Sequence, residues 1–300
     1  MFVKGDEPDG LLSLAGMVNS GAFGVLVSLQ LARTELAQAY EVGLIQRTPV
    51  PNLSAEDRDI LAELARRAWS LKRALDTRTE NSHAFTLPAM LQVEGGDTLA
   101  ERAAAWGERV RATDAELAAI QAEIDDRCFE LYGIGEDDRR AITEGFGGAA
   151  AGAAGGAEAD VSPEDADDDA DELATAADAA GLTAELLSWA VGLAFGRFDV
   201  RLATGERAIP PEPEPFDPLP VCSPGMLTGT DGLPLAAPPA EYPLDWPSDG
   251  ILVDDPGHPR DLTEAARLAF EEAFAPPTPC PPPPQAGEGE PVRRLPLSHV

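Results

Sequence analysis

The sequence predicts a mainly α-helical protein, and three observations lead to that fold class. Residues 54–75 and 98–131 repeat apolar side chains every three or four positions, each beginning with a capping residue. An acidic stretch rich in glycine and alanine, residues 147–180, offers no apolar face. The prolines are concentrated at the back, because 23 of the 28 follow Ile209. We therefore expect a helical front, an acidic linker and a proline-rich, mostly irregular C-terminal region.

The first predicted helix covers residues 11–31. It lies in a stretch of 22 residues without charge, 11–32, whose leucines and alanines fall near helical spacing. A stretch of this length would also be long enough to span a membrane. Its serines, Asn19 and three glycines favour a buried helix of a globular core instead. We therefore do not expect this protein to bind a membrane.

An extended segment is expected next, at residues 41–51. Val42, Leu44 and Ile45 favour strand conformation, and Pro49 and Pro51 impose an extended exit.

Two long amphipathic helices follow. Ser54 is expected to cap the first, with Asp57 three residues later, and Thr98 with Glu101 forms a capping box for the second. Their apolar stripes are Ile60, Leu64, Ala68, Leu71 and Leu75, and then Trp106, Val110, Leu117, Ile120, Ile124 and Leu131. An amphipathic helix is marginal alone, so the pair is expected to form an antiparallel hairpin with residues 79–97 as its tip. A groove for a partner helix is the alternative use of these stripes.

The remaining elements are shorter. A capped helix is expected at residues 136–145, followed by a flexible acidic tether at residues 147–180, whose alanine- and aspartate-rich part could form transient helix. The acidic run Asp165–Glu172 could in principle bind calcium, but it lacks the glycine and glutamate of an EF-hand. Thr183 is expected to cap a helix ending at Phe195. Beyond Pro210 we predict irregular chain with one helix at Thr263–Phe274.

Charge and cysteine content narrow the class of function. With 22 basic and 53 acidic residues the formal charge is −31, so the chain cannot hold DNA through its overall field. Twenty of the basic residues are arginine, which cannot act as a general base. The three cysteines are far apart and odd in number, which favours a reducing compartment and a cytoplasmic location.

The sequence contains no motif for catalysis, for a metal or for phosphate binding. His83, His258 and His299 are distant from one another and from the cysteines, so no metal ligand set is predicted. No glycine-rich phosphate loop follows a strand. One weak candidate remains: Gln46, Arg47 and Thr48, on the extended segment, could contact a base edge or a phosphate. Any surface loop can contain such residues, which is the plainer interpretation.

Four segments resemble a known family: residues 12–26 (LSLAGMVNSGAFGVL), 42–51 (VGLIQRTPVP), 124–142 (IDDRCFELYGIGEDDRRAI) and 187–205 (LSWAVGLAFGRFDVRLATG). The first two resemble the end of a target-recognition domain in restriction–modification proteins, with Asn19, Ser20 and Phe23 in matching places. The third resembles the segment after a helical spacer, although Cys128 stands near a usually aliphatic position. The fourth resembles the tail of PglX-like adenine-specific DNA methyltransferases of BREX and phage-growth-limitation systems, which are related to type IIG restriction enzymes, and that tail continues into the proline-rich segment ending at residues 250–259 (GILVDDPGHP).

The resemblance implies a division of the chain. Residues 1–52 would end a target-recognition domain, 53–146 would form the helical spacer, and 147–181 a disordered acidic linker. Residues 182–275 would hold a C-terminal helix with the proline-rich region, and 276–300 a disordered tail.

It also implies a mechanism that this chain cannot perform alone. The family's Asn-Pro-Pro-Tyr motif and its glycine-rich S-adenosylmethionine loop lie in an N-terminal domain, and neither occurs here. No residue is therefore assigned to catalysis or to the cofactor. The complete enzyme would use S-adenosylmethionine and contact DNA, with this chain a truncated, split or mis-started portion working beside a separate catalytic half or other defence proteins.

Two other functions remain open. A stand-alone acidic interaction protein or DNA mimic could dock on a basic partner by electrostatic steering. A non-functional gene remnant is the third possibility.

Overall fold

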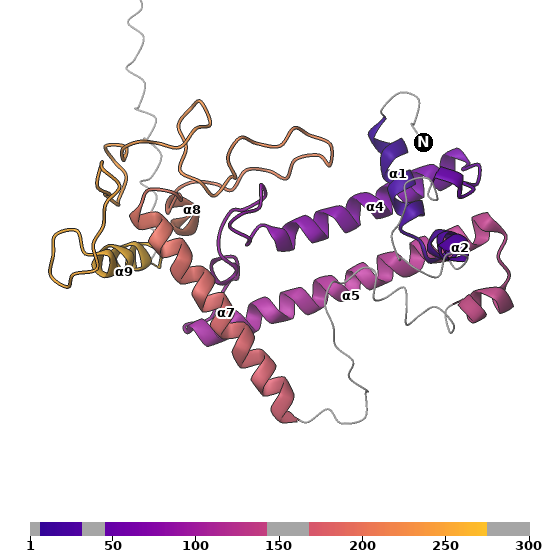
Figure 1. Cartoon of the computed structure of the whole chain (residues 1–300), viewed down its shortest axis with the longest axis horizontal. Coiled ribbons are helices and arrows are strands. Elements are labelled where there is room, and N and C mark those ends of the chain that lie inside the picture. The colour runs from indigo at the N-terminus through magenta and orange to yellow at the C-terminus, as the bar shows by residue number, and fades with distance from the viewer. Residues whose placement is uncertain (1–6, 32–45, 143–167, 275–300) are drawn as a thin grey trace, which may run out of the picture.

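The computed structural model describes residues 7–31, 46–142 and 168–274 (Figure 1). The predicted mainly α-helical class is confirmed. The helices are α1 (Pro8–Val18), α2 (Gly21–Leu31), α4 (Ala55–Asp76), the 3-10 turn η1 (Ala89–Leu91), α5 (Leu99–Tyr132), α7 (Asp168–Ala194), α8 (Arg201–Thr204) and α9 (Leu262–Ala273). Residues 136–142 form a further short helix where one was predicted, and the expected end of that helix lies outside the described residues.

The single helix predicted for residues 11–31 is wrong, because the chain bends by 63° between α1 and α2. Ser20 makes the break: its hydroxyl donates to the Met17 carbonyl at 2.7 Å and accepts from the Phe23 amide at 3.2 Å. The Asp125 carboxylate of α5 accepts from the Gly21 amide at 2.7 Å, so an anion stabilises the start of α2. Among the described residues no single helix is long and apolar enough to cross a membrane, although this bent pair passes that test jointly.

The helical hairpin is present, with the predicted N-cap at Ser54 and the predicted capping box at Thr98; Ser54 also proves to form a capping box. Ser54 and Asp57 cap α4, and Thr98 and Glu101 cap α5. At 1.5 Å per residue the 34 residues of α5 extend about 50 Å. Figure 1 shows α4 lying along α5, with α1 and α2 at one end of the pair and α7 crossing α5 at the other. The connection between α4 and α5 is no exposed tip, since Phe85, Leu87 and Met90 are buried.

The prediction of a disordered acidic linker over residues 147–181 is wrong for residues 168–181. Residues 168–181 belong to α7, which runs unbroken to Ala194. Thr183 is therefore not an N-cap but an internal residue, and its hydroxyl donates to the Ala179 carbonyl one turn earlier at 2.8 Å. Alanine favours helix, and Leu182, Leu186, Trp189 and Leu193 give the helix a buried face. The first part of the predicted linker lies outside the described residues.

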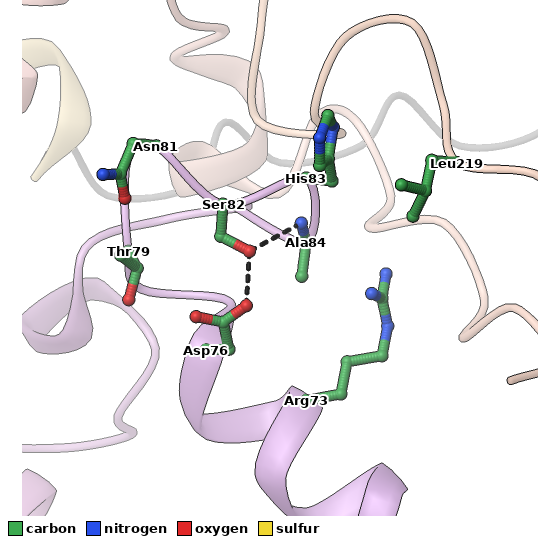
Figure 2. Close-up of a pocket in the computed structure, with 8 residues that line it drawn as sticks. All are labelled: Arg73, Asp76, Thr79, Asn81, Ser82, His83, Ala84 and Leu219. Carbon is green, nitrogen blue, oxygen red and sulfur yellow. Dashed lines mark hydrogen bonds between the residues drawn. The ribbon is translucent and has the colours of Figure 1, made fainter. Parts of the chain in front are cut away.

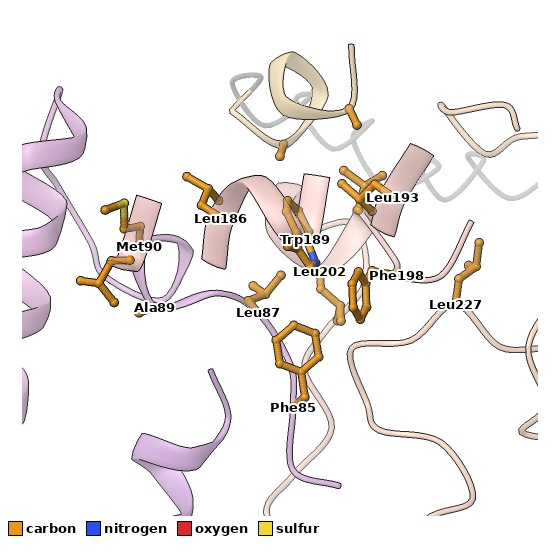
Figure 3. Packing of buried hydrophobic residues seen from close by; sticks show 14 of the residues in the cluster. Phe85, Leu87, Ala89, Met90, Leu186, Trp189, Leu193, Phe198, Leu202 and Leu227 are labelled. Carbon is orange, nitrogen blue, oxygen red and sulfur yellow. The ribbon is translucent and has the colours of Figure 1, made fainter. Parts of the chain in front are cut away.

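The buried side chains form two clusters. The N-terminal cluster lies between α1, α2, α4 and the second half of α5, and its buried members are Met17, Ala22, Leu61, Leu64, Ile120, Ile124, Cys128 and Phe129. The C-terminal cluster joins α7, α8, α9, the 85–90 connection and the first half of α5, as Figure 3 shows for Phe85, Leu186, Trp189, Phe198 and others. The stripe predicted along α5 is consequently divided: Trp106 serves the C-terminal cluster, and Ile120 and Ile124 serve the N-terminal one.

Residues 205–261 are irregular, as predicted, and the bridges formed within them are isolated ones, such as Thr228 with Pro234. The predicted helix at 263–274 is confirmed as α9, with the Asp261 side chain accepting from the Thr263 amide as its N-cap. The expected tail at 276–300 lies outside the described residues.

Candidate nucleic-acid interface

The three residues proposed to touch nucleic acid do not share one surface. Gln46 and Arg47 are exposed, but they lie in a helical turn rather than the expected extended segment. Residues 41–45 lie outside the described residues. Thr48 is 5% exposed, and its hydroxyl accepts a hydrogen bond from Gln30 of α2 at 2.8 Å. Thr48 therefore anchors the segment, and only Gln46 and Arg47 can face a ligand.

The segment that presents Arg47 is fixed against the hairpin. The Tyr132 hydroxyl at the end of α5 donates to the Pro49 carbonyl at 2.9 Å, and Val50 and Leu53 pack on the N-terminal cluster. Burial raises the pKa of Tyr132 to about 12, so this phenol stays protonated and remains a donor at neutral pH. Arg47 is thus held at the surface by contacts that its own sequence neighbourhood does not reveal.

A second surface, which sequence reasoning missed, runs along the C-terminal half of α4. The proline-rich residues 210–221, here named the strap, lie against it. One groove of about 280 Å³ lies between them, lined by Glu63, Arg66, Arg67, Trp69, Ser70, Glu212, Pro213, Glu214 and Pro215. A second open groove, of about 430 Å³, continues past the end of α4 and is lined by Arg73, Asp76, Thr79, Asn81, Ser82, His83, Ala84 and Leu219 (Figure 2). One sequence signal was present: residues 64–75 contain four basic and no acidic side chains.

The second groove is lined by Ser82, His83 and Asp76 together. These three residues do not form a catalytic triad. The Ser82 hydroxyl bonds directly to the Asp76 carboxylate and accepts from the Ala84 amide. A triad needs the imidazole between those two groups. Figure 2 shows the His83 ring turned away from the Ser82 hydroxyl, and among the described residues no hydrogen bond joins them.

A buried ionic network lies beneath the loops of the C-terminal cluster. Asp199 is fully buried, and its carboxylate accepts two hydrogen bonds from Arg201, at 2.9 and 2.8 Å, and one from Arg207 at 2.8 Å. Burial alone would raise the pKa of Asp199, but the arginine hydrogen bonds outweigh it and hold that pKa below its ordinary value. The Tyr242 hydroxyl accepts from the Val200 amide and donates to the Phe198 carbonyl. These hydrogen bonds join residues 198–201 to Arg207 and Tyr242, so the network has a structural role.

The part of the chain that the structure describes contains isolated bridges instead of a sheet. A glycine-rich loop that joins a strand to a helix, the usual site of a nucleotide cofactor, is therefore not found among these residues. These residues also contain no group of three His, Cys, Asp or Glu side chains able to hold a metal. Cys128 is buried, which raises the pKa of its thiol and makes it inert.

Comparison of the chain with protein-family models, with curated proteins and with solved structures gives no match. The interpretation of the candidate surfaces therefore depends on the chain's own residues and geometry.

Proposed function

We propose that this chain is the C-terminal DNA-recognition and spacer portion of an S-adenosylmethionine-dependent, adenine-specific DNA methyltransferase of a phage-defence system, of the BREX or restriction–modification type. The observation that favours this function is the shared helix α5. It packs into both clusters, and Trp106 in one cluster and Ile124 in the other are separated by about 27 Å along the helix axis, at 1.5 Å per residue. That is the task of a spacer that positions a recognition element relative to the rest of an enzyme.

The segments that resemble the family contain positions where the backbone conformation or the packing restricts which residue can stand. Within 124–142, Gly133 ends α5 in the left-handed conformation with φ of 67°. Within 187–205, a side chain on Gly192 would collide with the Phe198 ring, and Asp199 is the centre of the buried network. These positions have specific structural reasons for their residues, which supports reading the resemblance as more than a shared composition.

In this proposal the work is divided between this chain and a catalytic domain encoded elsewhere. The recognition end is the α1–α2 region with Gln46 and Arg47, and the spacer is α4 with α5. The methyl donor and the catalytic motif belong to the other domain, because neither motif occurs in these 300 residues. The complete enzyme would extrude an adenine and methylate its exocyclic amine.

Two assays on the purified chain test the proposal. We expect no heat of binding to S-adenosylmethionine and no transfer of a tritiated methyl group to DNA. Fluorescence anisotropy with a labelled duplex should show weak, salt-dependent binding that Arg47→Ala weakens, because a surface cation contributes to phosphate affinity.

Arg58→Ala is the matched control, since Arg58 is also exposed and lies on the same half of the molecule. Methyl incorporation by the chain alone, or equal weakening by the two substitutions, would contradict the proposal.

A second function, a stand-alone acidic interaction protein, is favoured by the charge of the surface. Arginines such as Arg66, Arg127 and Arg267 are already paired with carboxylates, while the formal charge is −31. Salt-sensitive capture of a basic protein together with no affinity for duplex DNA would support this alternative over the first.

A further inference from the structure

The strap contacts α4 through carboxylates. Glu214 pairs with Arg66, which also pairs with Asp9 of α1 at 2.8 Å. The Ser70 hydroxyl donates to the Glu212 carboxylate at 2.8 Å. Two anionic groups of the strap, two residues apart, are therefore bound by side chains one helical turn apart on α4.

The surface beneath the strap is a concentrated basic face in an otherwise acidic protein. Arg66, Ser70 and Arg73 are spaced by four and three residues, which places them on one side of the helix. Arg67 and Trp69 line the same groove, and the Arg67 guanidinium is paired with Glu116 of α5 at 2.6 Å. The Arg73 guanidinium lies 5.7 Å from the centre of the Trp69 ring and is in none of the ion pairs found among the described residues. We call these five residues the α4 basic face, with Glu63 and Asp76 at its two ends.

The strap is held loosely. Its apolar side chains are exposed rather than buried in a core: Phe216 is 51% exposed, Leu219 69% and Val221 77%. The ion pair of Glu214 with Arg66 is at the surface, where such a pair contributes about 0–1 kcal/mol and is screened by salt. Four prolines between residues 210 and 215 stiffen the segment, so it can leave α4 as a unit.

We propose that the α4 basic face binds the phosphodiester backbone of duplex nucleic acid, and that the strap is an acidic cover which the nucleic acid displaces. The carboxylates of Glu212 and Glu214 occupy positions where phosphate oxygens would accept the same hydrogen bonds. Arginines and a serine hydroxyl are ordinary donors to phosphate. The proposal rests on the proposed function, because it names the surface by which the spacer contacts DNA.

The test uses the full chain and a fluorescein-labelled duplex of 20 base pairs, with anisotropy measured at 50 and 200 mM salt. Glu212→Gln with Glu214→Gln removes the two strap carboxylates. We expect this double variant to bind the duplex at least fivefold more tightly than the unaltered chain at 50 mM salt. Adding Arg66→Gln and Arg73→Gln to the double variant should reverse the gain.

The matched control is Glu94→Gln with Glu241→Gln, which changes the net charge equally at two exposed positions away from α4. It should leave duplex affinity unchanged. Equal tightening by both double variants would show that only overall charge matters, and no tightening by the strap variant would show that the face does not bind phosphate; either result overturns the proposal. Unchanged thermal midpoints confirm that the variants are folded.

The outcome is separable from that of the proposed function. Methyl transfer and the Arg47 comparison test the function, whereas the strap variants test only this surface. A strap variant that gained affinity for an acidic peptide and none for the duplex would identify a protein-binding face instead, and would likewise overturn the proposal.

Discussion

The two clusters are built in different ways, although they share α5. The N-terminal cluster is a contact between regular helices, with Leu61 of α4 fully buried against Ile120 and Ile124 of α5. The C-terminal cluster places long irregular segments on α7 and is organised by aromatic rings, close-packed glycines and the Asp199 network. The first depends on the burial of aliphatic surface. The second also depends on polar groups that must all be satisfied once buried.

The difference shows where stability is vulnerable. Aliphatic helix packing loses energy gradually when methylene groups are removed. A buried carboxylate held by two cations fails abruptly when one partner changes. Substitutions of aliphatic side chains and of the buried carboxylate should therefore differ in their cost, and the largest loss is expected for the carboxylate.

Asp199→Asn should cost about 4 kcal/mol of unfolding free energy, because it leaves two arginines without their buried counter-ion. Denaturant unfolding followed by tryptophan fluorescence measures this loss, since Trp189 and Trp246 lie in the C-terminal cluster. The control is Asp249→Asn, whose pair with Arg260 is at the surface and should contribute about 1 kcal/mol or less. Equal losses would mean that burial of the Asp199 network is unimportant.

The same carboxylate predicts a pH dependence. Its pKa is lowered in the folded state, so its stabilisation is complete above the ordinary aspartate pKa and is lost as the pH falls toward the lowered value. As the pH falls below the ordinary aspartate pKa of 3.8, we expect the C-terminal cluster of the unaltered chain to lose stability more steeply than that of the Asp199→Asn variant. Parallel acid-unfolding curves for the two proteins would contradict this.

Leu61→Ala should cost about 3 kcal/mol by leaving a cavity between α4 and α5. Hydrogen exchange read by mass spectrometry should show the loss in amides of α4 and of the second half of α5. Leu29→Ala, at a position that is 56% exposed, is the control and should change little. Equal loss of protection in the amides of α7 and of α4 would show that the two clusters unfold as one unit, and would contradict a separate response of the N-terminal cluster.

Gly225→Ala should cost about 2 kcal/mol, because the added Cβ would lie 2.4 Å from the Thr86 carbonyl oxygen, an atom of the backbone that cannot swing away. Gly181→Ala in α7 is the opposite case. Nothing lies within 4 Å of its added Cβ, so the substitution should stabilise the helix by about 0.5–1 kcal/mol. Thermal unfolding of the two variants should therefore shift in opposite directions.

Ser54→Ala should have the smallest destabilising effect, about 1 kcal/mol, because it removes the hydroxyl that accepts from the Asp57 amide. Thr98→Ala removes the corresponding bond to the Glu101 amide in α5 and should cost a similar amount. Hydrogen exchange in the first turns of α4 and α5 checks both. A much larger loss at Thr98 would indicate that the start of α5 matters more to the C-terminal cluster than its cap alone.

The features that could be predicted from the sequence are those whose causes are local. Capping boxes at Ser54 and Thr98 need only residues three positions apart, and helical periodicity needs only one turn of chain. The break at Ser20 involves local hydrogen bonds to Met17 and Phe23, but the start of α2 also depends on Asp125, 104 residues away, which accepts from the Gly21 amide and which the local sequence does not reveal. Thr183 resembled an N-cap because nothing in its own turn reveals that the helix begins earlier.

The candidate surfaces followed the same pattern. The exposure of Gln46 and Arg47 agrees with their polarity, whereas the burial of Thr48 depends on Gln30 of another helix. The α4 basic face is visible as a run without acidic residues, but its acidic cover comes from a segment 148 positions further along the chain. Asp199 gave no signal beyond an acid flanked by arginines, and only its burial distinguishes it from the many surface carboxylates.

The shared helix α5 also limits how the molecule can be divided. A fragment ending near residue 115 would lose Ile120, Ile124 and Phe129 from the N-terminal cluster, and would separate Ala103 and Trp106 from the α7, α8 and α9 side chains that they pack against. A fragment beginning there would do the reverse. Neither half is expected to survive limited proteolysis on its own, so cleavage in the middle of α5 should lead to complete digestion instead of two stable pieces.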